Sequence, residues 1–264
     1  MDFDFSQIAV PFRMQPGLRR LALGTHSLSA LQPESAMHAE KLAVLQAGQS
    51  RLQIPGFDAQ AAFRAIARYS GRDVLSAQAL PLELIFEEDF AVLDGADGTL
   101  PWLCVCLPSH WAPEDKLGLD FASVHAPVAD NQALLAAADR LLALVTAGEC
   151  WERWVWTITP SGRYDQHPLR HPRTPWPLGL DPQALAAHCW LRAERQVFFP
   201  VGQGTRQAVF AIRVMLQPLV DAVRAPGAAR RLHDSLASMS QAVLDYKNLG
   251  AARGHLLCWL RAVA

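Results

Sequence analysis

One histidine and two cationic side chains lie in segments that the sequence predicts to be stiff or extended. His125 belongs to "SVHAPV", where Pro127 biases Ala126 towards an extended backbone. Lys116 lies nine residues earlier in "EDKLG", and Arg153 begins "RWVWTIT". A neutral imidazole can bind a metal ion, and fixed cations can bind an anionic group. These residue types therefore indicate a site for a ligand that combines both features.

A second group of charged residues lies in "LRAERQ", Leu191–Gln196. If this segment is a strand, Arg192 and Glu194 share one face and Arg195 points to the other face. Two ordinary explanations compete with a binding role. Arg192 and Glu194 can form a structural ion pair, and a single histidine can be a hydrogen-bonded structural residue.

Several cations near one sheet suit an anionic ligand, and haem is such a ligand. Haem requires an axial base, apolar walls and cations for its two propionates. The histidine, the aromatic segment "RWVWTIT" and the Lys/Arg residues could supply all three, although the eight tryptophans also fit an ordinary core. Phosphate-binding glycine loops and a Gly-x-Ser-x-Gly element are absent from the sequence, which argues against nucleotide-fold and serine-hydrolase classes.

Composition limits the remaining classes of partner. The net charge of −1 over 264 residues gives no electrostatic case for nucleic acid or an anionic membrane. Apolar runs stay below about 18 residues without a charge, so no membrane span is predicted. The start, "MDFDFSQIAV", lacks the features of a secretory signal, and a cytoplasmic protein is expected. The five cysteines, without Cys-x-x-Cys spacing, are expected to be buried thiols rather than disulfides or zinc ligands.

The hydrophobic pattern predicts the elements that must position these residues. Helices are predicted at 33–45, 57–69 (with Asp58 as a cap) and 131–148, and in a tail, 218–262, broken near Pro226 and Gly250. Strands are predicted on both sides of "DGADGT" within 84–108, and at 153–159, 192–199 and 207–216. Residues 10–31 and the proline-rich 160–182 are predicted to be irregular.

Strands thus cluster in the middle of the chain and are joined by hairpin-like links. This order predicts an α+β fold with an antiparallel sheet and flanking N- and C-terminal helices, rather than a doubly wound parallel fold. We interpret residues 1–264 as a single domain. It would comprise a helical N-terminal extension (1–80), a sheet core (81–215) and C-terminal helices (216–264).

Six segments, in chain order, resemble the haem-dependent oxidative N-demethylase alpha-subunit family. They are "VPFRMQPGLRRL", "EEDFAVL", "LPSHWAPEDKLGLDFASVHAPV", "RWVWTI", "LRAERQ" and "LDYKNLG". The longest, 107–128, resembles the family's Pro-Ser-x-Trp, Lys-hydrophobic-Gly and His-x-Pro-Val pattern. Six ordered matches from residue 11 to about 250 are far more specific than any single one.

The resemblance implies a fold, a cofactor and partners. It implies a haem b-binding domain with a PAS-like antiparallel sheet, and an oxidoreductase of the monooxygenase type. Family members of known activity oxidise an N-methyl group of a small amine with dioxygen and release formaldehyde. Their electrons come from NADPH through a separate flavin and iron–sulfur reductase subunit. An oligomer is also compatible with this interpretation.

The same resemblance implies roles for individual residues. It implies His125 as the axial iron ligand, Lys116, Arg153, Arg192 and Arg195 as cofactor-binding cations, and Glu194 as a catalytic candidate. His110 is a further catalytic candidate, although it departs from the family pattern. His110 stands where the family pattern has arginine, Val155 replaces an asparagine, and Pro200-Val201-Gly202 replaces an arginine-rich stretch. His110 therefore becomes a rival ligand or a distal hydrogen-bond donor. These departures motivate an alternative to the N-demethylase prediction, a non-catalytic haem-binding or gas/redox-sensing PAS-like protein.

Overall fold

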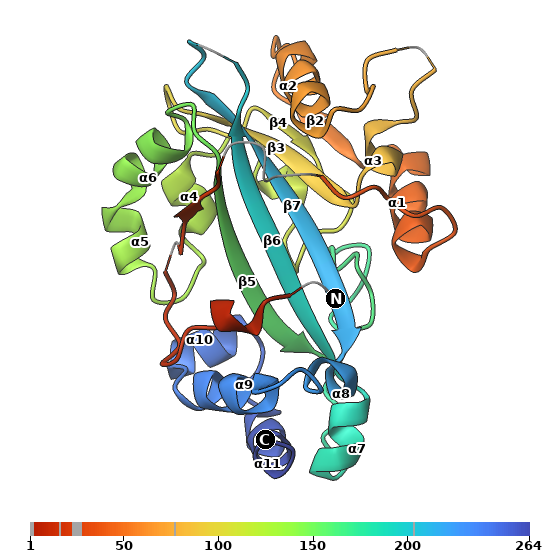
Figure 1. The fold of residues 1–264 in the computed structure, drawn as a ribbon, viewed down its shortest axis with the longest axis vertical. Coiled ribbons are helices and arrows are strands. Elements are labelled where there is room, and N and C mark those ends of the chain that lie inside the picture. Colours follow the sequence, from red (N-terminus) through yellow and green to blue (C-terminus); the bar gives the residue numbers. More distant parts are fainter. Residues whose placement is uncertain (1–2, 16, 23–27, 77, 203) are drawn as a thin grey trace.

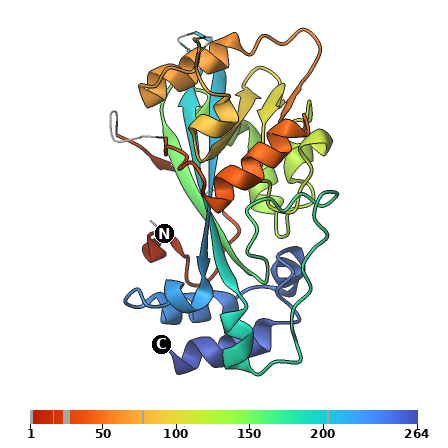
Figure 2. The ribbon, with the colours of Figure 1, turned by 90° about the vertical axis from the view of Figure 1, so that its right-hand side faces the viewer.

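A seven-stranded antiparallel sheet forms the centre of the molecule (Figure 1). The computed structural model describes residues 3–15, 17–22, 28–76, 78–202 and 204–264. Its strand order is β1-β5-β6-β7-β3-β4-β2, and every neighbouring pair is antiparallel. Helices flank the sheet on both sides and at one end (Figures 1 and 2), so the predicted α+β class is confirmed.

All strands predicted in the middle of the chain are present, and two short ones join from the N-terminal part. The strands are β1 (Arg19–Arg20), β2 (Arg51–Gln53), β3 (Glu88–Asp94), β4 (Trp102–Cys104), β5 (Trp151–Thr159), β6 (Trp190–Pro200) and β7 (Gln207–Pro218). The first 80 residues thus contribute both edge strands as well as helices. Residues 23–27 of the segment predicted as irregular, and Pro16, lie outside the described residues.

Short helices account for most of the remaining structure. They are α1 (Ala36–Gln46), α2 (Gln60–Ser70), α3 (Leu82–Ile85), α4 (Phe121–His125), α5 (Gln132–Ala136), α6 (Ala138–Val145), α7 (Pro182–Ala187), α8 (Leu219–Ala222), α9 (Ala228–Ala237), α10 (Gln241–Tyr246) and α11 (Arg253–Ala262). The N-terminus of α1 is capped by the Ser35 hydroxyl, which accepts from His38 N at 3.1 Å. Residues 160–181 contain no helix or strand, as the prolines predict.

Two backbone predictions were wrong, and Cys258 is exposed, whereas the other four cysteines are buried as predicted. The predicted helix 131–148 is divided at Ala137, whose φ of −100° and ψ of 3° leave the helical region. Ala126 is helical rather than extended, with φ −54° and ψ −38°. The bias imposed by Pro127 is overcome here because Ala126 ends a helical turn that Asp120 caps, accepting from Ser123 N at 2.7 Å.

The two faces of the sheet bury different partners. One face carries Phe90, Val197 and Phe199 and is covered by residues of α2 and α3. The other carries Ala91, Leu103 and Val105 and is covered by the segment that contains Trp111 and Leu117. The C-terminal helices and α7 bury a separate core against the lower end of the sheet (Figure 1). In the described part of the chain, no helix is long and apolar enough to cross a membrane.

Candidate functional site

Strands β5 and β6 place three of the predicted site residues on one face of the sheet. The register pairs Arg153 with Gln196, Val155 with Glu194 and Thr157 with Arg192. Directly opposed residues share a face, so Arg153, Arg192 and Glu194 point to the side that carries Ala91 and Leu103. Arg195 points to the opposite side, as its spacing predicts, and its Nε donates to Glu152 Oε2 at 2.8 Å.

His125 ends α4 with its imidazole in a defined tautomer. Its Nδ1 lies 2.7 Å from the carbonyl oxygen of Phe121, one helical turn earlier. A carbonyl oxygen only accepts, so Nδ1 carries the proton and Nε2 carries the lone pair. The imidazole also lies 4.1 Å, centroid to centroid, from the Phe121 ring. This is the arrangement by which a protein orients a histidine for metal coordination.

The surroundings of His125 keep it neutral. Burial lowers its pKa, the hydrogen bond to Phe121 opposes that change, and the charges of Arg153 and Lys116 lower the pKa further. The charges of both cations therefore act on the imidazole. Lys116 is itself oriented, since its Nζ donates to Val124 O at 3.2 Å. Lys116, His125 and Arg153, predicted from three separate segments, are brought together.

Helix α10 adds two residues that the sequence analysis did not select. Burial lowers the pKa of Lys247 to about 8; Glu194 opposes this change and Arg153 adds to it. Lys247 Nζ donates to Trp156 O at 2.8 Å. Tyr246 precedes it, and its pKa is raised by burial and by Glu194. Both residues lie in "LDYKNLG", one of the six segments that resemble the N-demethylase family, and this resemblance was the only signal that could have selected them. The sequence did not indicate which residues their side chains would contact. We name Lys116, His125, Arg153, Glu194 and Lys247 the strand-face cluster.

Two buried donors on this face have no acceptor among the described residues. They are Arg153 Nε and Trp151 Nε1. Burial lowers the pKa of Arg153, while the charges of Glu194 and Tyr246 oppose that effect. An unpaired buried donor costs free energy until an acceptor reaches it. The face therefore offers donors that a ligand carboxylate would satisfy.

Arg192 and Glu194 do not form a direct ion pair but are joined through Ser109. The Arg192 guanidinium is 2% exposed, and its Nε donates to Ser109 Oγ at 2.9 Å. The Ser109 hydroxyl in turn donates to Glu194 in a short hydrogen bond. Arg192 Nη1 and Nη2 donate to the carbonyl oxygens of Arg163 (3.1 Å) and Leu107 (3.3 Å). Because its nitrogens already have acceptors, Arg192 holds the 107–110 segment rather than presenting a free donor.

His110 has a backbone conformation that few residues adopt. Its φ is 60°, in the left-handed region, and its main-chain N donates to Gln166 O at 3.2 Å. Burial lowers the pKa of its imidazole to about 4, with added effects from Arg173 and Arg192. His110 is therefore neutral and lies near Arg192, next in the chain to the Ser109 link to Glu194.

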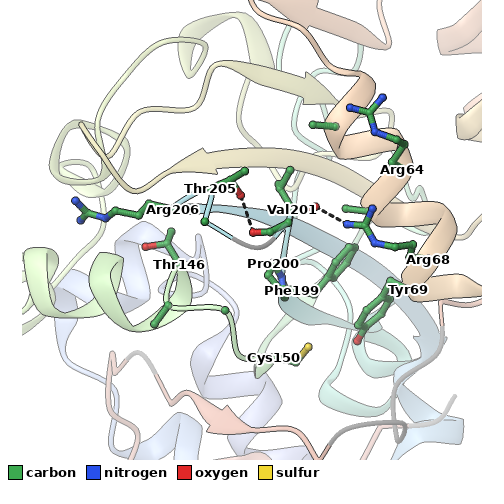
Figure 3. Close-up of a pocket in the computed structure, with 16 residues that line it drawn as sticks. Arg64, Arg68, Tyr69, Thr146, Cys150, Phe199, Pro200, Val201, Thr205 and Arg206 are labelled. Carbon is green, nitrogen blue, oxygen red and sulfur yellow. Dashed lines mark hydrogen bonds between the residues drawn. The ribbon is translucent and has the colours of Figure 1, made fainter.

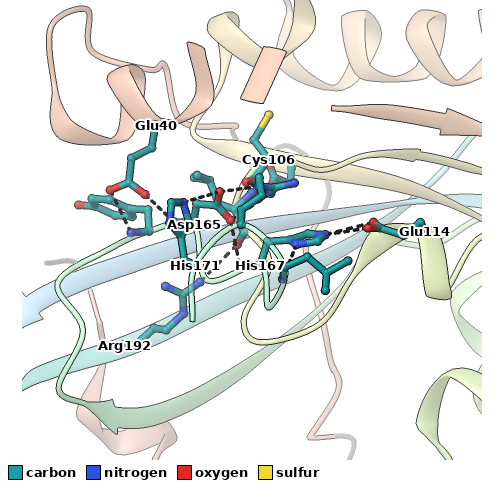
Figure 4. Close-up of polar contacts among 12 residues, drawn as sticks. Glu40, Cys106, Glu114, Asp165, His167, His171 and Arg192 are labelled. Atoms are coloured by element: carbon teal, nitrogen blue, oxygen red, sulfur yellow. Dashed lines mark hydrogen bonds and ion pairs between the residues drawn. The ribbon is translucent and has the colours of Figure 1, made fainter. Parts of the chain in front are cut away.

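A polar network fixes the proline-rich loop, residues 160–181, against α1 and the segment that contains Glu114 (Figure 4). The buried Asp165 accepts from Arg170 Nε at 2.7 Å and lies 3.2 Å from His171 Nε2. Glu40 of α1 accepts from the main-chain N of Asp165 at 2.6 Å. His167 Nε2 lies 3.1 Å from the Glu114 carboxylate, which links the loop to the segment leading to Lys116. The loop thus braces the segment that carries Lys116 and His125, two of the five residues of the strand-face cluster.

Apolar side chains complete the face. Phe198 and Phe210 stack with their ring centroids 4.5 Å apart, and Trp111 and Leu117 lie against the same cluster of buried residues. Among the described residues there is no group of three or more His, Cys, Asp or Glu that could hold a metal ion. A haem iron, however, can be held by a single histidine. An oriented imidazole, unpaired buried donors and aromatic walls all fit haem.

Comparison with known protein families gives an independent result. A family model described as haem-dependent oxidative N-demethylase, alpha subunit-like, matches residues 71–257. The chain belongs to this family. The match covers more than two thirds of the 264 residues and includes every residue of the strand-face cluster. Of the six segments that resemble the N-demethylase family, only "VPFRMQPGLRRL" precedes the matched range.

Proposed function

We propose that this protein is a haem-binding oxidoreductase that removes an N-methyl group from a small amine as formaldehyde. Dioxygen would be the oxidant, and a separate reductase with flavin and iron–sulfur centres would pass electrons from NADPH. Family membership supports this class of reaction. The single observation that carries the proposal is His125, whose Nδ1 hydrogen bond to Phe121 O at 2.7 Å leaves Nε2 free to coordinate iron.

The strand-face cluster supplies the other groups that haem b needs. His125 Nε2 would hold the iron, and Arg153 and Lys116 would bind the propionates. The stacked Phe198 and Phe210 would form part of the apolar wall. When bound, haem supplies activation of dioxygen and transfer of electrons.

Glu194 is the residue we assign to the substrate. Its carboxylate accepts from the Ser109 hydroxyl and from Gln196 Nε2, the latter at 2.6 Å. A small methylated amine is a cation at neutral pH, and a fixed carboxylate is its natural acceptor. Ser109, held by Arg192, keeps Glu194 in one orientation, so Arg192 acts as a positioning residue. His110 would sit beside this acceptor as a neutral hydrogen-bonding group.

The strand order supports a PAS-like interpretation of the core. The five central strands follow the order β4-β3-β7-β6-β5, with the short helices α4–α6 between β4 and β5 in the chain. We propose that β1, β2, α1 and α2 extend this core at one end and that α7–α11 extend it at the other.

A second function follows from the departures at His110 and Val155. A haem-binding or gas/redox-sensing protein without turnover needs His125 and the cations, but it does not need the substrate acceptor. In that case the recombinant protein would bind haem and carbon monoxide but produce no formaldehyde from methylated amines.

The test is an absorption spectrum of the full chain with added haem, then with dithionite and carbon monoxide. We expect a Soret band that shifts on reduction, and its loss in His125→Ala. The matched control is His188→Ala, because His188 Nδ1 also lies 2.8 Å from the carbonyl four residues earlier but is exposed at the far end of the sheet. Failure of wild-type protein to bind haem, or an unchanged band in His125→Ala, would contradict the proposal. A second assay separates the two functions: the haem-loaded protein is incubated with dimethylamine and a chemical reductant in air. Release of formaldehyde supports the N-demethylase, and haem binding without formaldehyde supports the non-catalytic function.

A further inference from the structure

A cavity (Figure 3) lies on the α2 side of the sheet, opposite to the face that carries the strand-face cluster. Its volume is about 950 Å³. One wall is α2, and a second is the segment 146–150 between α6 and β5. The third is formed by the end of β6 and by residues between β6 and β7, namely Val201, Gly202, Gly204, Thr205 and Arg206. Phe199 and Val201 line it, and both belong to the buried cluster that covers the α2 side of the sheet.

The charge of this cavity is one-sided. Arg64, Arg68 and Arg206 line it, whereas no Asp or Glu does so within the described part of the chain. The carboxylates closest in sequence to the 146–150 wall already have cationic partners. Glu149 lies 2.6 Å from Arg20, and Glu152 lies 2.8 Å from Arg195. The cationic charge of the cavity is therefore not cancelled by its own walls.

The three guanidinium groups are differently placed. Arg68 Nη2 donates to Val201 O at 2.6 Å, which fixes its orientation. Among the described residues, the side chains of Arg64 and Arg206 have no hydrogen-bond or ion-pair partner, although the main-chain carbonyl of Arg206 accepts from Gly95 N. Arg64 and Arg68 lie on the α2 side of the cavity and Arg206 lies on the opposite side (Figure 3). An anion entering the cavity would meet guanidinium forks, which are suited to phosphate and carboxylate oxygens.

The inner wall is apolar and aromatic. Tyr69 and Phe199 stack with ring centroids 3.9 Å apart and planes 9° apart. Ala61, Ala65 and Pro200 add small apolar surfaces beside them. A fully hydrated inorganic anion would gain nothing from these surfaces, whereas an anion with an apolar or aromatic body would.

We propose that this cavity binds an organic phosphate monoester of mononucleotide size. Its phosphate would lie on the arginines, and its planar body would lie against the ring of Tyr69, which is backed by the buried Phe199. The volume falls within the range of about 300–1,000 Å³ that is usual for small-molecule sites, and it greatly exceeds the needs of a phosphate ion. The site is separate from the strand-face cluster, so its occupant is neither haem nor the amine.

The experiment is isothermal titration calorimetry of the full chain with AMP, adenosine and inorganic phosphate. We expect AMP to bind at least about ten-fold more tightly than either adenosine or phosphate, because only AMP engages both the arginines and the aromatic wall. Arg64→Gln and Arg206→Gln should each weaken AMP binding several-fold. Arg140→Gln is the control, since Arg140 is an exposed arginine of α6 that does not line the cavity.

Three results would overturn this inference. The first is the absence of AMP binding at about 5 mM, a concentration that would largely fill a site with a Kd of about 1 mM. The second is equal affinity for AMP and adenosine. The third is an unchanged affinity for AMP in both arginine variants. Circular dichroism of the variants checks that each is folded. His125→Ala should bind AMP like the wild type, so this test and the haem test fail independently.

Discussion

At the scale of single residues, His110 shows how burial and neighbouring cations make the stability of a fold sensitive to pH. Its pKa lies at about 4, below the ordinary 6.5, because the imidazole is half-buried near Arg173 and Arg192. The unfolded chain therefore binds a proton that the folded chain excludes between these two values. The contribution of His110 to the free energy of unfolding should therefore be fully present above about pH 6.5. It should be lost as the pH falls towards 4.

Replacing His110 with asparagine tests this dependence. Asparagine tolerates the left-handed backbone at φ 60° but does not titrate, so His110→Asn should lose less stability than wild type between about pH 7 and pH 5. The measurement is the melting temperature across that range. His188→Asn, at an exposed histidine, should keep the wild-type dependence. An identical pH profile for wild type and His110→Asn would refute the assignment.

At the scale of elements, a fully buried lysine joins α1 to β3. Lys41 Nζ lies 3.1 Å from Asp89 Oδ1 and donates to the carbonyl oxygens of Phe86 (3.0 Å) and Glu88 (2.8 Å). Asp89 Oδ2 accepts from Leu107 N at 2.6 Å. Leu107 begins the segment 107–128, which carries His110 and Lys116. These contacts fix α1, β3 and the segment 107–128 relative to one another.

Removing one member of this pair should be costly. Lys41→Met leaves Asp89 buried with its charge unpaired, so we expect a loss of about 3–5 kcal/mol in the free energy of unfolding. Lys41→Met combined with Asp89→Asn should recover part of that loss. The control is Arg224→Met, which breaks the exposed Arg224–Asp221 pair and should cost less than about 1 kcal/mol. Urea unfolding measures all four proteins, and equal losses in both single variants would contradict this account.

At the scale of the whole molecule, the C-terminal helices and the sheet share one core. Trp156 and Ala193 of the sheet are buried together with Leu232 of α9 and Trp259 of α11. The strand-face cluster depends on this docking because α10, which carries Tyr246 and ends beside Lys247, lies between α9 and α11 in the chain. Ligand binding at the cluster should therefore be coupled to the stability of the entire chain.

Calorimetry with and without haem tests that coupling. Haem at about 100 times its dissociation constant should add about 2.7 kcal/mol to the free energy of unfolding and raise the melting temperature in a single transition. His125→Ala should abolish the shift, and His188→Ala should retain it. A shift of equal size in His125→Ala would mean that haem binds elsewhere.

Much of the fold and part of the site follow from local sequence. Alternation predicts β5, β6 and β7 and assigns Arg192 and Glu194 to one face and Arg195 to the other. The edge strand β2, with only Arg51–Gln53, is too short for its pattern to be distinguished from a loop. Its conformation is set by pairing with β4, about 50 residues later in the chain.

The sequence by itself determined the family, the antiparallel α+β architecture and His125 as the candidate axial base. Only the tertiary structure decided that the charges of Lys116 and Arg153 act on that imidazole and that Glu194 and Lys247 lie in reach of Arg153. It also decided that Arg192 is engaged in holding Ser109. The difference has a physical reason. Periodicity and capping act within about one helical turn or one strand, whereas the cluster is assembled by strand register and by the docking of α4 and α10.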